Sequence, residues 1–202
     1  MAELNRYGEH VYWDPLPTVA VSQTLPIAGA GPGNSLGPPS DYLRGVWSER
    51  DWRNVPGPFY GAQTDSCGTG PLAAPDHVLL EDEYGSEVVF RQPRTVHETQ
   101  LVLTAAWSDP FAGYACDGDD HWTLGQIRQW WADRTRLVEW IDRVDRMWSI
   151  SDHEYERAHA SAVRAYHHYL EHGLENDLRE YGFWLEHRRA ITPADTLPDL
   201  GP

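Results

Sequence analysis

One long amphipathic stretch constrains the fold of this chain more than any other feature. Within residues 124–148, apolar side chains recur at three- and four-residue intervals, the period of one face of an α-helix. They are Leu124, Ile127, Trp131, Val138, Ile141, Val144 and Trp148. Further apolar residues widen this face, namely Trp130, Leu137, Trp140 and Met147. The pattern therefore predicts a central helix of about seven turns.

Two more helices are predicted after this one. Ser151 and Glu154 have the spacing of a capping box, and an apolar stripe that begins at Tyr155 and Ala158 continues to about residue 172. Gly173 is a natural stop, and a third stripe indicates a helix over about 174–189. Three helices with short connections predict an antiparallel bundle, or helices folded against a small sheet. The proline-rich segment 192–202 cannot continue a helix and is predicted to form a surface strap.

The middle of the chain predicts a small sheet and one further helix. Two short apolar runs, 77–80 and 87–91, flank the acidic, glycine-containing turn "EDEYGS", a pattern typical of a β-hairpin. In residues 95–108, Thr95 and Glu98 fit a capping box, which favours a helix over a strand. Together with the predicted bundle, these elements indicate an α+β fold.

Residues 1–75 are rich in proline and glycine, and only 18–22 has the character of a strand. Aromatic residues punctuate this segment, among them Trp13, Trp47 and Trp52. A flexible arm and a coil laid over the body are the two interpretations, and the aromatic anchors favour the coil. We therefore predict an irregular N-terminal coil over 1–75 and an α+β core over 76–202.

The charge of the chain bounds its partners. There are 31 acidic and 16 basic residues, so the net charge is −15, and this favours neither nucleic acid nor an anionic membrane surface as a partner. The acidity either serves solubility alone or attracts a partner with a basic surface. No apolar run approaches the length of a membrane span, and the first residues lack the pattern of a signal peptide. These features predict a cytoplasmic protein.

Every basic residue is arginine, and lysine does not occur in the sequence. The bias favours a bacterial source with a GC-rich genome. Schiff-base catalysis and the Walker-type phosphate grip both need lysine and are excluded. The glycine-rich stretch 27–39 is not a dinucleotide fingerprint either, because Pro38-Pro39 blocks the helix that should follow it.

The loop "CDGDDHW" at 116–122 contains the highest density of possible metal ligands and acid/base groups in the sequence. Asp117, Asp119 and His121 offer oxygen and imidazole ligands for a divalent metal. The purely structural alternative is a helix start, in which Thr123 and Gln126 form a capping box. The aspartates then stabilise the positive end of the helix dipole. We favour this alternative and predict no cofactor, with a divalent metal as the second possibility.

A second loop, "DSCGTG" at 65–70, could contribute a thiol nucleophile, Cys67, with His77 or His121 as the base. In the enzymatic alternative the catalytic residues are Cys67, Asp119, Asp120 and His121. Residues predicted to bind a ligand surround these loops. They are Phe59, Tyr60, Thr64, Asp65, Arg91, Arg94 and Trp122.

The terminal helices are also rich in histidine. His168 and His172 would share a helix face, but the motif of a zinc protease is incomplete, and a solvated surface is the favoured interpretation.

No motif in this sequence establishes catalysis, so whether the chain is an enzyme stays open. We predict an acidic partner-binding protein, such as an inhibitor, an immunity-type protein or an assembly component. The alternative is a small-molecule enzyme that uses the two loops "DSCGTG" and "CDGDDHW", with their acidic and histidine side chains as ligands of a divalent metal or as acid/base groups. The predicted partner is a protein with a basic surface or, in the alternative, a small polar ligand.

Overall fold

The computed structural model describes residues 12–31 and 33–201, and the chain divides into two compact units. Among the described residues, 13–118 form the mixed unit, and Tyr12 with 119–201 form the helical unit. Across the described residues there are seven α-helices and two antiparallel sheets of two strands each, which confirms a mixture of helix and sheet. The predicted boundary at residue 75 lies inside the mixed unit. Among the described helices, none is long and apolar enough to cross a membrane.

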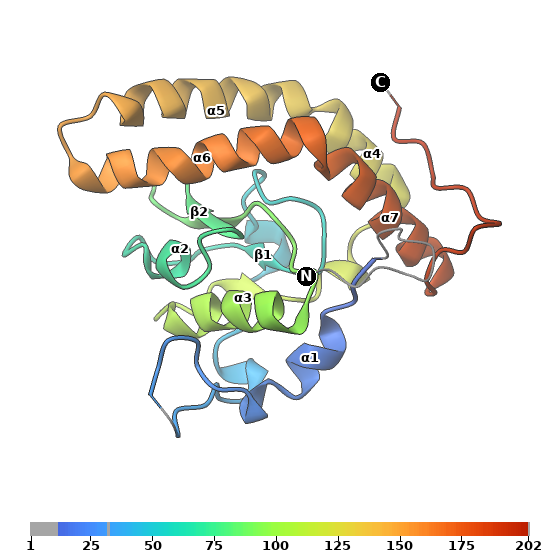
Figure 1. Ribbon diagram of the computed structural model, residues 1–202, viewed down its shortest axis with the longest axis horizontal. Coiled ribbons are helices and arrows are strands. Elements are labelled where there is room, and N and C mark those ends of the chain that lie inside the picture. Colours follow the sequence, from blue (N-terminus) through green and yellow to red (C-terminus); the bar gives the residue numbers. More distant parts are fainter. Residues whose placement is uncertain (1–11, 32, 202) are drawn as a thin grey trace. The chain divides into compact units, whose positions relative to one another are not determined.

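The helical unit contains four helices. They are α4 (Leu124–Ala132), α5 (Arg134–Ser149), α6 (Glu154–His172) and α7 (Leu174–His187). Helices α5 and α6 run side by side as an antiparallel pair (Figure 1). The prediction of one helix over 124–148 is wrong at Asp133, whose backbone (φ −83°, ψ 5°) interrupts it. The Asp133 carboxylate accepts a hydrogen bond from Gln129 at 3.0 Å, and this local polar contact accompanies the break between α4 and α5.

The predicted capping box at the start of α6 is also wrong. The helix begins at Glu154, and its N-cap is His153, which makes no capping hydrogen bond through its side chain. Ser151 instead accepts a hydrogen bond from the backbone N–H of His153 at 3.0 Å. The serine therefore closes a turn before the helix, a use of its hydroxyl that competes with capping.

The buried face of α6 differs from the predicted stripe. Tyr155 and Ala158 are exposed, whereas His159 is buried and lies against the rings of Trp148 and Tyr155, with centroids 6.2 and 4.4 Å away. The other buried members of this face include Ala160, Val163, Tyr166, Tyr169 and Leu170. His159 is therefore buried although the predicted apolar stripe, which began at Tyr155 and Ala158, did not include it.

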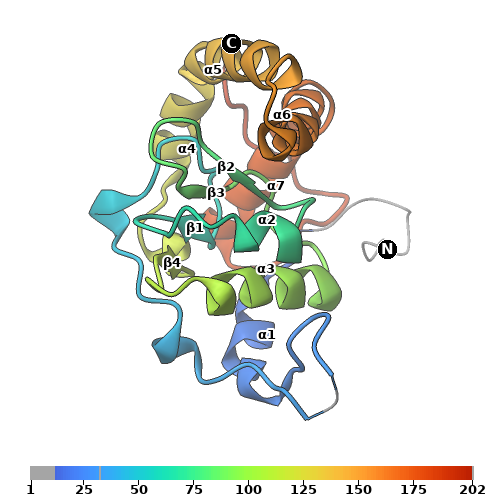
Figure 2. The same ribbon diagram turned by 90° about the vertical axis from the view of Figure 1, so that its left-hand side faces the viewer.

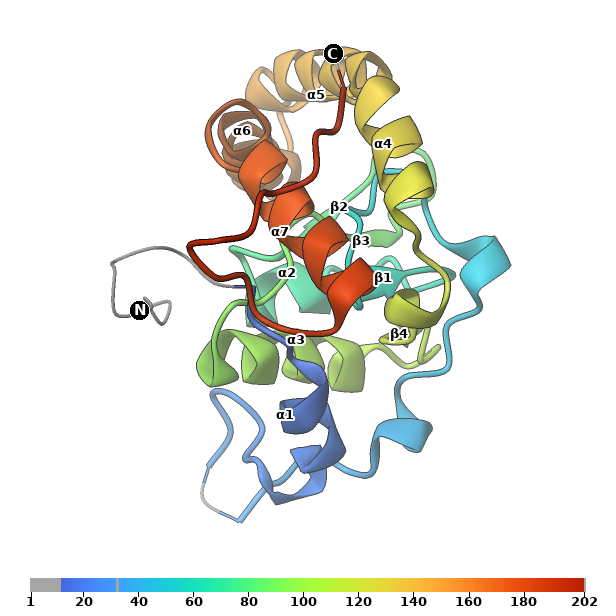
Figure 3. The same cartoon turned by 90° about the vertical axis from the view of Figure 1, so that its right-hand side faces the viewer.

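The C-terminal segment runs along α7 and is held there by arginine side chains (Figure 3). Arg128 Nε donates to the carbonyl of Asp199 at 2.8 Å, and Arg179 Nε donates to the carbonyl of Pro198 at 2.9 Å. Leu200 is buried. These contacts attach the last described residues to α4 and α7.

The mixed unit places α3 (Val96–Ser108) between α1 (Leu16–Ala20) and α2 (Thr69–Ala73), as Figure 2 shows. The predicted helix over 95–108 is confirmed, and the hydroxyl of Thr95 accepts a hydrogen bond from the backbone N–H of Glu98 at 3.1 Å. The predicted strand at 18–22 is wrong, because α1 covers its first half. Proline in the first turn favours that helix.

Two small sheets complete the mixed unit. β2 (Val78–Leu80) pairs antiparallel with β3 (Glu87–Val89), which confirms the predicted hairpin. β1 (Tyr60–Gly61) pairs with β4 (Tyr114–Ala115), two short segments from distant parts of the sequence. All residues of these strands are buried.

The side chain of Asn54 connects the two sheets. Its Nδ2 donates to the carbonyl of Gly61 at 2.7 Å, and its Oδ1 accepts from the N–H groups of Gly61 at 2.9 Å and Val89 at 2.8 Å. The side chain amide therefore takes the place of a strand peptide between β1 and β3. Asn54 is only 2% exposed, so these bonds are shielded from water.

The core of the mixed unit draws heavily on the proline- and glycine-rich segment. Val19, Leu36, Tyr42 and Phe59 are buried together with residues of β2, β3 and α3. This segment also contains four short helical or 3₁₀ pieces before β1, namely α1, η1 (Ser22–Thr24), η2 (Pro39–Asp41) and η3 (Trp47–Glu49). Residues 13–75 thus supply apolar side chains that the unit buries.

Candidate functional site

The mixed unit holds a pocket of about 520 Å³, a size typical of ligand sites. Its lining comes from the segments 44–49, 63–64, 84–86 and 111–113. Three lining side chains are large, apolar and unusually exposed: Tyr84 at 76%, Phe111 at 68% and Val46 at 50%. Exposed apolar groups gathered around a hollow mark a surface suited to binding.

The turn that carries Tyr84 is fixed by the buried carboxylate of Glu81. One carboxylate oxygen of Glu81 accepts from the N–H groups of Tyr84 at 2.7 Å and Ser86 at 2.9 Å. The other oxygen accepts from the N–H of Glu83 at 2.7 Å and lies 3.7 Å from the guanidinium of Arg53. Hydrogen bonds to a charged acceptor are among the stronger ones, so this turn has a defined shape before any ligand arrives.

The turn that carries Phe111 is fixed in the same manner by Asp109. Its carboxylate accepts from the N–H groups of Asp65 at 3.1 Å, Phe111 at 3.0 Å and Gly113 at 2.7 Å. Ala112 has a φ of 52°, a left-handed conformation that costs free energy in a residue other than glycine. The buried carboxylate of Asp109 compensates this cost and holds the turn in shape.

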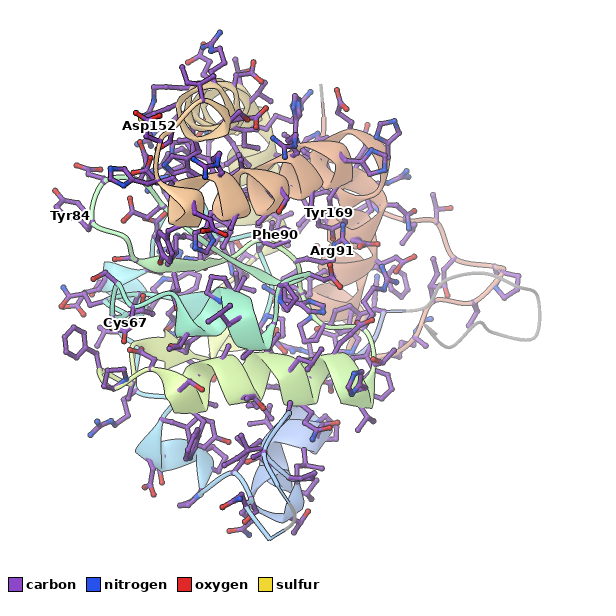
Figure 4. All side chains as sticks on the ribbon, turned by 60° about the vertical axis from the view of Figure 1, so that its left-hand side comes forward. Cys67, Tyr84, Phe90, Arg91, Asp152 and Tyr169 are labelled. Carbon is purple, nitrogen blue, oxygen red and sulfur yellow. The ribbon has the colours of Figure 1, made fainter. Side chains whose placement is uncertain are left out.

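The segments around the pocket are also tied to one another. The hydroxyl of Thr64 accepts a hydrogen bond from the N–H of Glu87 at 2.6 Å, which joins the 63–67 loop to the start of β3. A Cβ atom on Gly85 would lie 3.0 Å from the Cβ of Ser66, so the loop and the hairpin turn are in close contact. Figure 4 shows Cys67 and Tyr84 at the same edge of this unit. The pocket therefore has a preformed frame.

Cys67, the predicted nucleophile, has an exposed thiol beside this frame. A hydrogen bond to Asp65 and the charge of that carboxylate raise the pKa of the Cys67 thiol above its usual value. A reactive cysteine needs the opposite shift, because the thiolate is the nucleophile. Cys116 has different surroundings, since it packs against the core of the mixed unit. The surroundings of Cys67 favour a passive thiol.

We expect Cys67 to react more slowly with iodoacetamide at neutral pH than free cysteine does. The test is the rate of alkylation against pH in a Cys116→Ser background, where Cys67 is the one reporting thiol. The midpoint should lie above that of free cysteine, and Asp65→Asn should lower it. A midpoint below that of free cysteine would contradict the passive role and support the enzymatic alternative.

The predicted ligand-binding residues have different positions. Thr64 lines the pocket, and Asp65 lies buried behind it, where its carboxylate accepts from the N–H of Cys67 at 3.2 Å. Phe59 and Tyr60 are fully buried in the core, so their rings are not accessible to a ligand. Trp122 is buried as well. Of these residues, Thr64 belongs to the pocket lining, although it is itself buried and its hydroxyl bonds to the backbone of Asp65 and Glu87.

Arg91 and Arg94 follow β3 at the other end of the hairpin from Tyr84. The carbonyl of Arg91 lies 3.0 Å from the Nδ1 of the buried His77, and the N–H of Arg94 donates to the carboxylate of Glu98 at 2.6 Å. The backbone of this segment is therefore fixed by local contacts. A ligand clamp formed by the two guanidinium groups stays a prediction.

Two aspartates of the acidic loop 116–122 are engaged in structural contacts with residues distant in the sequence. Asp117 falls in the mixed unit and accepts from the hydroxyl of Tyr60 at 2.7 Å. Asp119 falls in the helical unit with Asp120 and His121; its carboxylate accepts from Tyr181 at 2.7 Å and lies 3.8 Å from the guanidinium of Arg188.

The predicted capping box of Thr123 and Gln126 is confirmed. In the part of the chain that the structure describes, no group of three or more histidine, cysteine or acidic side chains is arranged to hold a metal ion.

The helical unit has a further hollow of about 530 Å³, lined in part by His167 and His172. The lining histidines contact neighbouring side chains. His167 lies 3.7 Å from Glu171 of the same lining and 3.8 Å from Asp142 outside it, and the ring of His172 stacks at 4.3 Å on that of His168, also outside the lining. Exposed aromatic side chains do not frame this hollow as they frame the pocket of the mixed unit.

Tyr84 and Phe111 were not among the residues selected from the sequence. A usable signal existed, because each follows an acidic residue by two or three positions in a turn that also contains glycine, "EDEYG" and "DPFAG". Acidic side chains that accept backbone N–H groups two or three residues ahead are typical of such turns. An aromatic residue inside such a turn is held at the surface, where a partner can reach it.

The comparisons with known proteins give no relative: no protein-family model, curated protein or solved structure matches the chain.

Proposed function

We propose that this chain is a partner-binding protein without catalysis, and that the pocket of the mixed unit is its docking site. The observation that supports this function is the pair of exposed aromatic side chains, Tyr84 and Phe111, at the rim of one pocket. Aromatic side chains dominate the binding energy of protein interfaces because they bury a large area with few rotatable bonds.

The rigidity of the turns supports the same function. Binding costs free energy when loops and side chains must be ordered, and a surface that is already ordered avoids this cost. Glu81 and Asp109 each accept three backbone N–H groups, so the backbone under both aromatic rings is set in the free protein. A loop that must close over a substrate needs the opposite property.

The charge supports a protein partner with a basic surface, since a chain with a net charge of −15 attracts such a surface and accelerates the encounter. A cytoplasmic location belongs to this proposal. Both cysteines are free, and the thiol of Cys67 is exposed, as is typical of a reducing compartment.

The test is affinity capture with the unmodified chain, a Tyr84→Ser/Phe111→Ser variant and a control variant, followed by titration of the captured protein. We expect a partner that binds the unmodified chain and is lost from a Tyr84→Ser/Phe111→Ser variant. Each single substitution should weaken the titrated complex by about thirtyfold, the effect of removing one hot-spot side chain. A photo-reactive phenylalanine analogue at position 111 should cross-link to the same partner.

Leu72→Ser is the matched control, because Leu72 is an equally apolar side chain of the same unit, 82% exposed and outside the pocket. This variant should bind as the unmodified chain does. Equal loss of the partner in both variants would indicate general stickiness. Retention of the partner by the double variant would refute docking at the pocket.

A further inference from the structure

We propose that the docking pocket receives one cationic side chain, an arginine or a lysine, from a basic segment of the partner. This inference rests on the proposed function and specifies what enters the pocket. The pocket lining contains two exposed aromatic rings, those of Tyr84 and Phe111, and the carboxylate of Glu49. A cation over an aromatic face is attracted by the negative face of the ring.

The chain itself repeatedly adopts this type of contact. The guanidinium of Arg50 lies 3.8 Å from the ring centroid of Trp47, and that of Arg53 lies 4.7 Å from the ring centroid of Trp52. The helical unit contains further examples, Arg134 on Trp131 and Arg188 on Trp184, both at 4.4 Å. Tyr84 and Phe111 differ from Trp47 and Trp52 in being far more exposed, so their faces are accessible to a cation from another chain.

The local charge favours a cation over an anion. Tyr84 directly follows the acidic run Glu81-Asp82-Glu83, and Glu49 lines the pocket beside it. Arg44 is the basic residue of the lining, and the buried Arg53 lies 2.7 Å from Asp51, 3.7 Å from Glu81 and 4.0 Å from Glu83. The acids of this region outnumber its bases, and the mixed unit as a whole is acidic. An anionic or neutral side chain would lack this attraction.

The test uses methylguanidinium chloride as the probe and methylurea as its neutral counterpart of similar shape. Each compound is titrated into the full chain while backbone amide NMR signals are followed. We expect saturable shifts at Ser86, Phe111 and Gly113 with methylguanidinium, and several-fold weaker binding of methylurea. Tyr84→Leu should weaken binding of the cation about fivefold, whereas Tyr84→Phe should retain it. Glu49→Gln should also weaken it.

Two results would overturn the inference. Equal binding of methylurea would show that the pocket selects shape and not charge, and an absence of saturable shifts with methylguanidinium would show that the pocket takes no cation. Neither result bears on whether Tyr84 and Phe111 dock a protein, because capture and cross-linking at position 111 decide that separately. If the Tyr84→Ser/Phe111→Ser variant loses the captured partner but neither methylguanidinium nor methylurea binds the unmodified chain, docking at the pocket is supported and the cationic side chain is refuted.

Discussion

Asn54→Ala should lower the free energy of unfolding by at least about 3 kcal/mol, the largest effect that we expect from one substitution outside the apolar core. The alanine would leave the N–H groups of Gly61 and Val89 without the acceptor that the amide provides, while the carbonyl of Gly61 would keep only its bond from the N–H of Asp51 at 3.1 Å. A buried polar group that loses its partner costs more than the net gain of one hydrogen bond, because it cannot return to water. Denaturant unfolding at neutral pH measures the effect.

Asn34→Ala is the control for this prediction. Asn34 is exposed, and its amide donates to one carbonyl, that of Gly31, at 3.2 Å. We expect its substitution to change the free energy of unfolding by less than about 0.5 kcal/mol. An Asn54→Ala variant within 1 kcal/mol of the unmodified chain, a tolerance of about the size of one net hydrogen bond, would show that the two sheets do not depend on the amide.

The second large effect is a pH dependence that comes from Glu87. Burial raises the pKa of this carboxyl to about 7, and the charges of Asp65 and Asp109 act in the same direction. Between the ordinary pKa of a glutamate and 7, the folded protein keeps a proton that the unfolded chain has lost. Stability should therefore fall as the pH rises through this window, by on the order of 3 kcal/mol in total.

Glu87→Gln should remove this dependence, because the amide has no proton to lose. From pH 4.5 to pH 8, the free energy of unfolding of the variant should rise relative to that of the unmodified chain by on the order of 3 kcal/mol. Denaturant unfolding at several pH values measures this difference. The comparison between variants cancels the contribution of His77 and His159, whose pKa values are lowered by burial and which act in the opposite direction. A difference that does not change with pH would contradict the prediction.

Tyr114→Phe provides a second test of the titration of Glu87. The hydroxyl of Tyr114 donates to the Glu87 carboxylate at 2.5 Å, a contact that favours the ionised carboxylate. Its removal should raise the pKa of Glu87 further, so the fall in stability should shift to higher pH. An unchanged profile in this variant would show that the hydroxyl does not act on the titration.

Helical periodicity predicted the core of the helical unit well, because local spacing determines which face of a helix is apolar. Ile127, Ile141, Val144 and Tyr181 are all buried as the pattern predicts. The pattern did not predict the buried position of a polar residue in α6. His159 is buried against the ring of Trp148, and burial lowers its pKa, so the neutral imidazole behaves as part of the core.

The mixed unit could be predicted only in its local elements. The β2–β3 hairpin and the cap of α3 depend on residues a few positions apart, and both were predicted. The bridge by Asn54 joins groups up to 35 positions apart, and the residues next to Asn54 carry no pattern that indicates it. The same holds for the candidate site, because the pocket forms where four separate segments meet.

The sequence predicts that the acidic side chains lie on the surface, but several of them are buried in the structure. Glu81, Glu87 and Asp109 are buried; Glu81 and Asp109 each accept three backbone N–H groups, and Glu87 accepts that of Gly70. These carboxylates have a structural role in shaping the turns. A count of charges could not reveal this, since the distinction depends on which N–H groups each carboxylate reaches.

The contiguity of the mixed unit bears on how the chain is made. All residues of Trp13–Gly118 are synthesised before those of α4 to α7, so this unit can complete its core while synthesis continues. The helical unit cannot do so, because Arg128 bonds to the carbonyl of Asp199, seventy-one positions later. We expect the candidate pocket to form first during translation, and the helical unit to be completed only when the segment around Asp199 emerges.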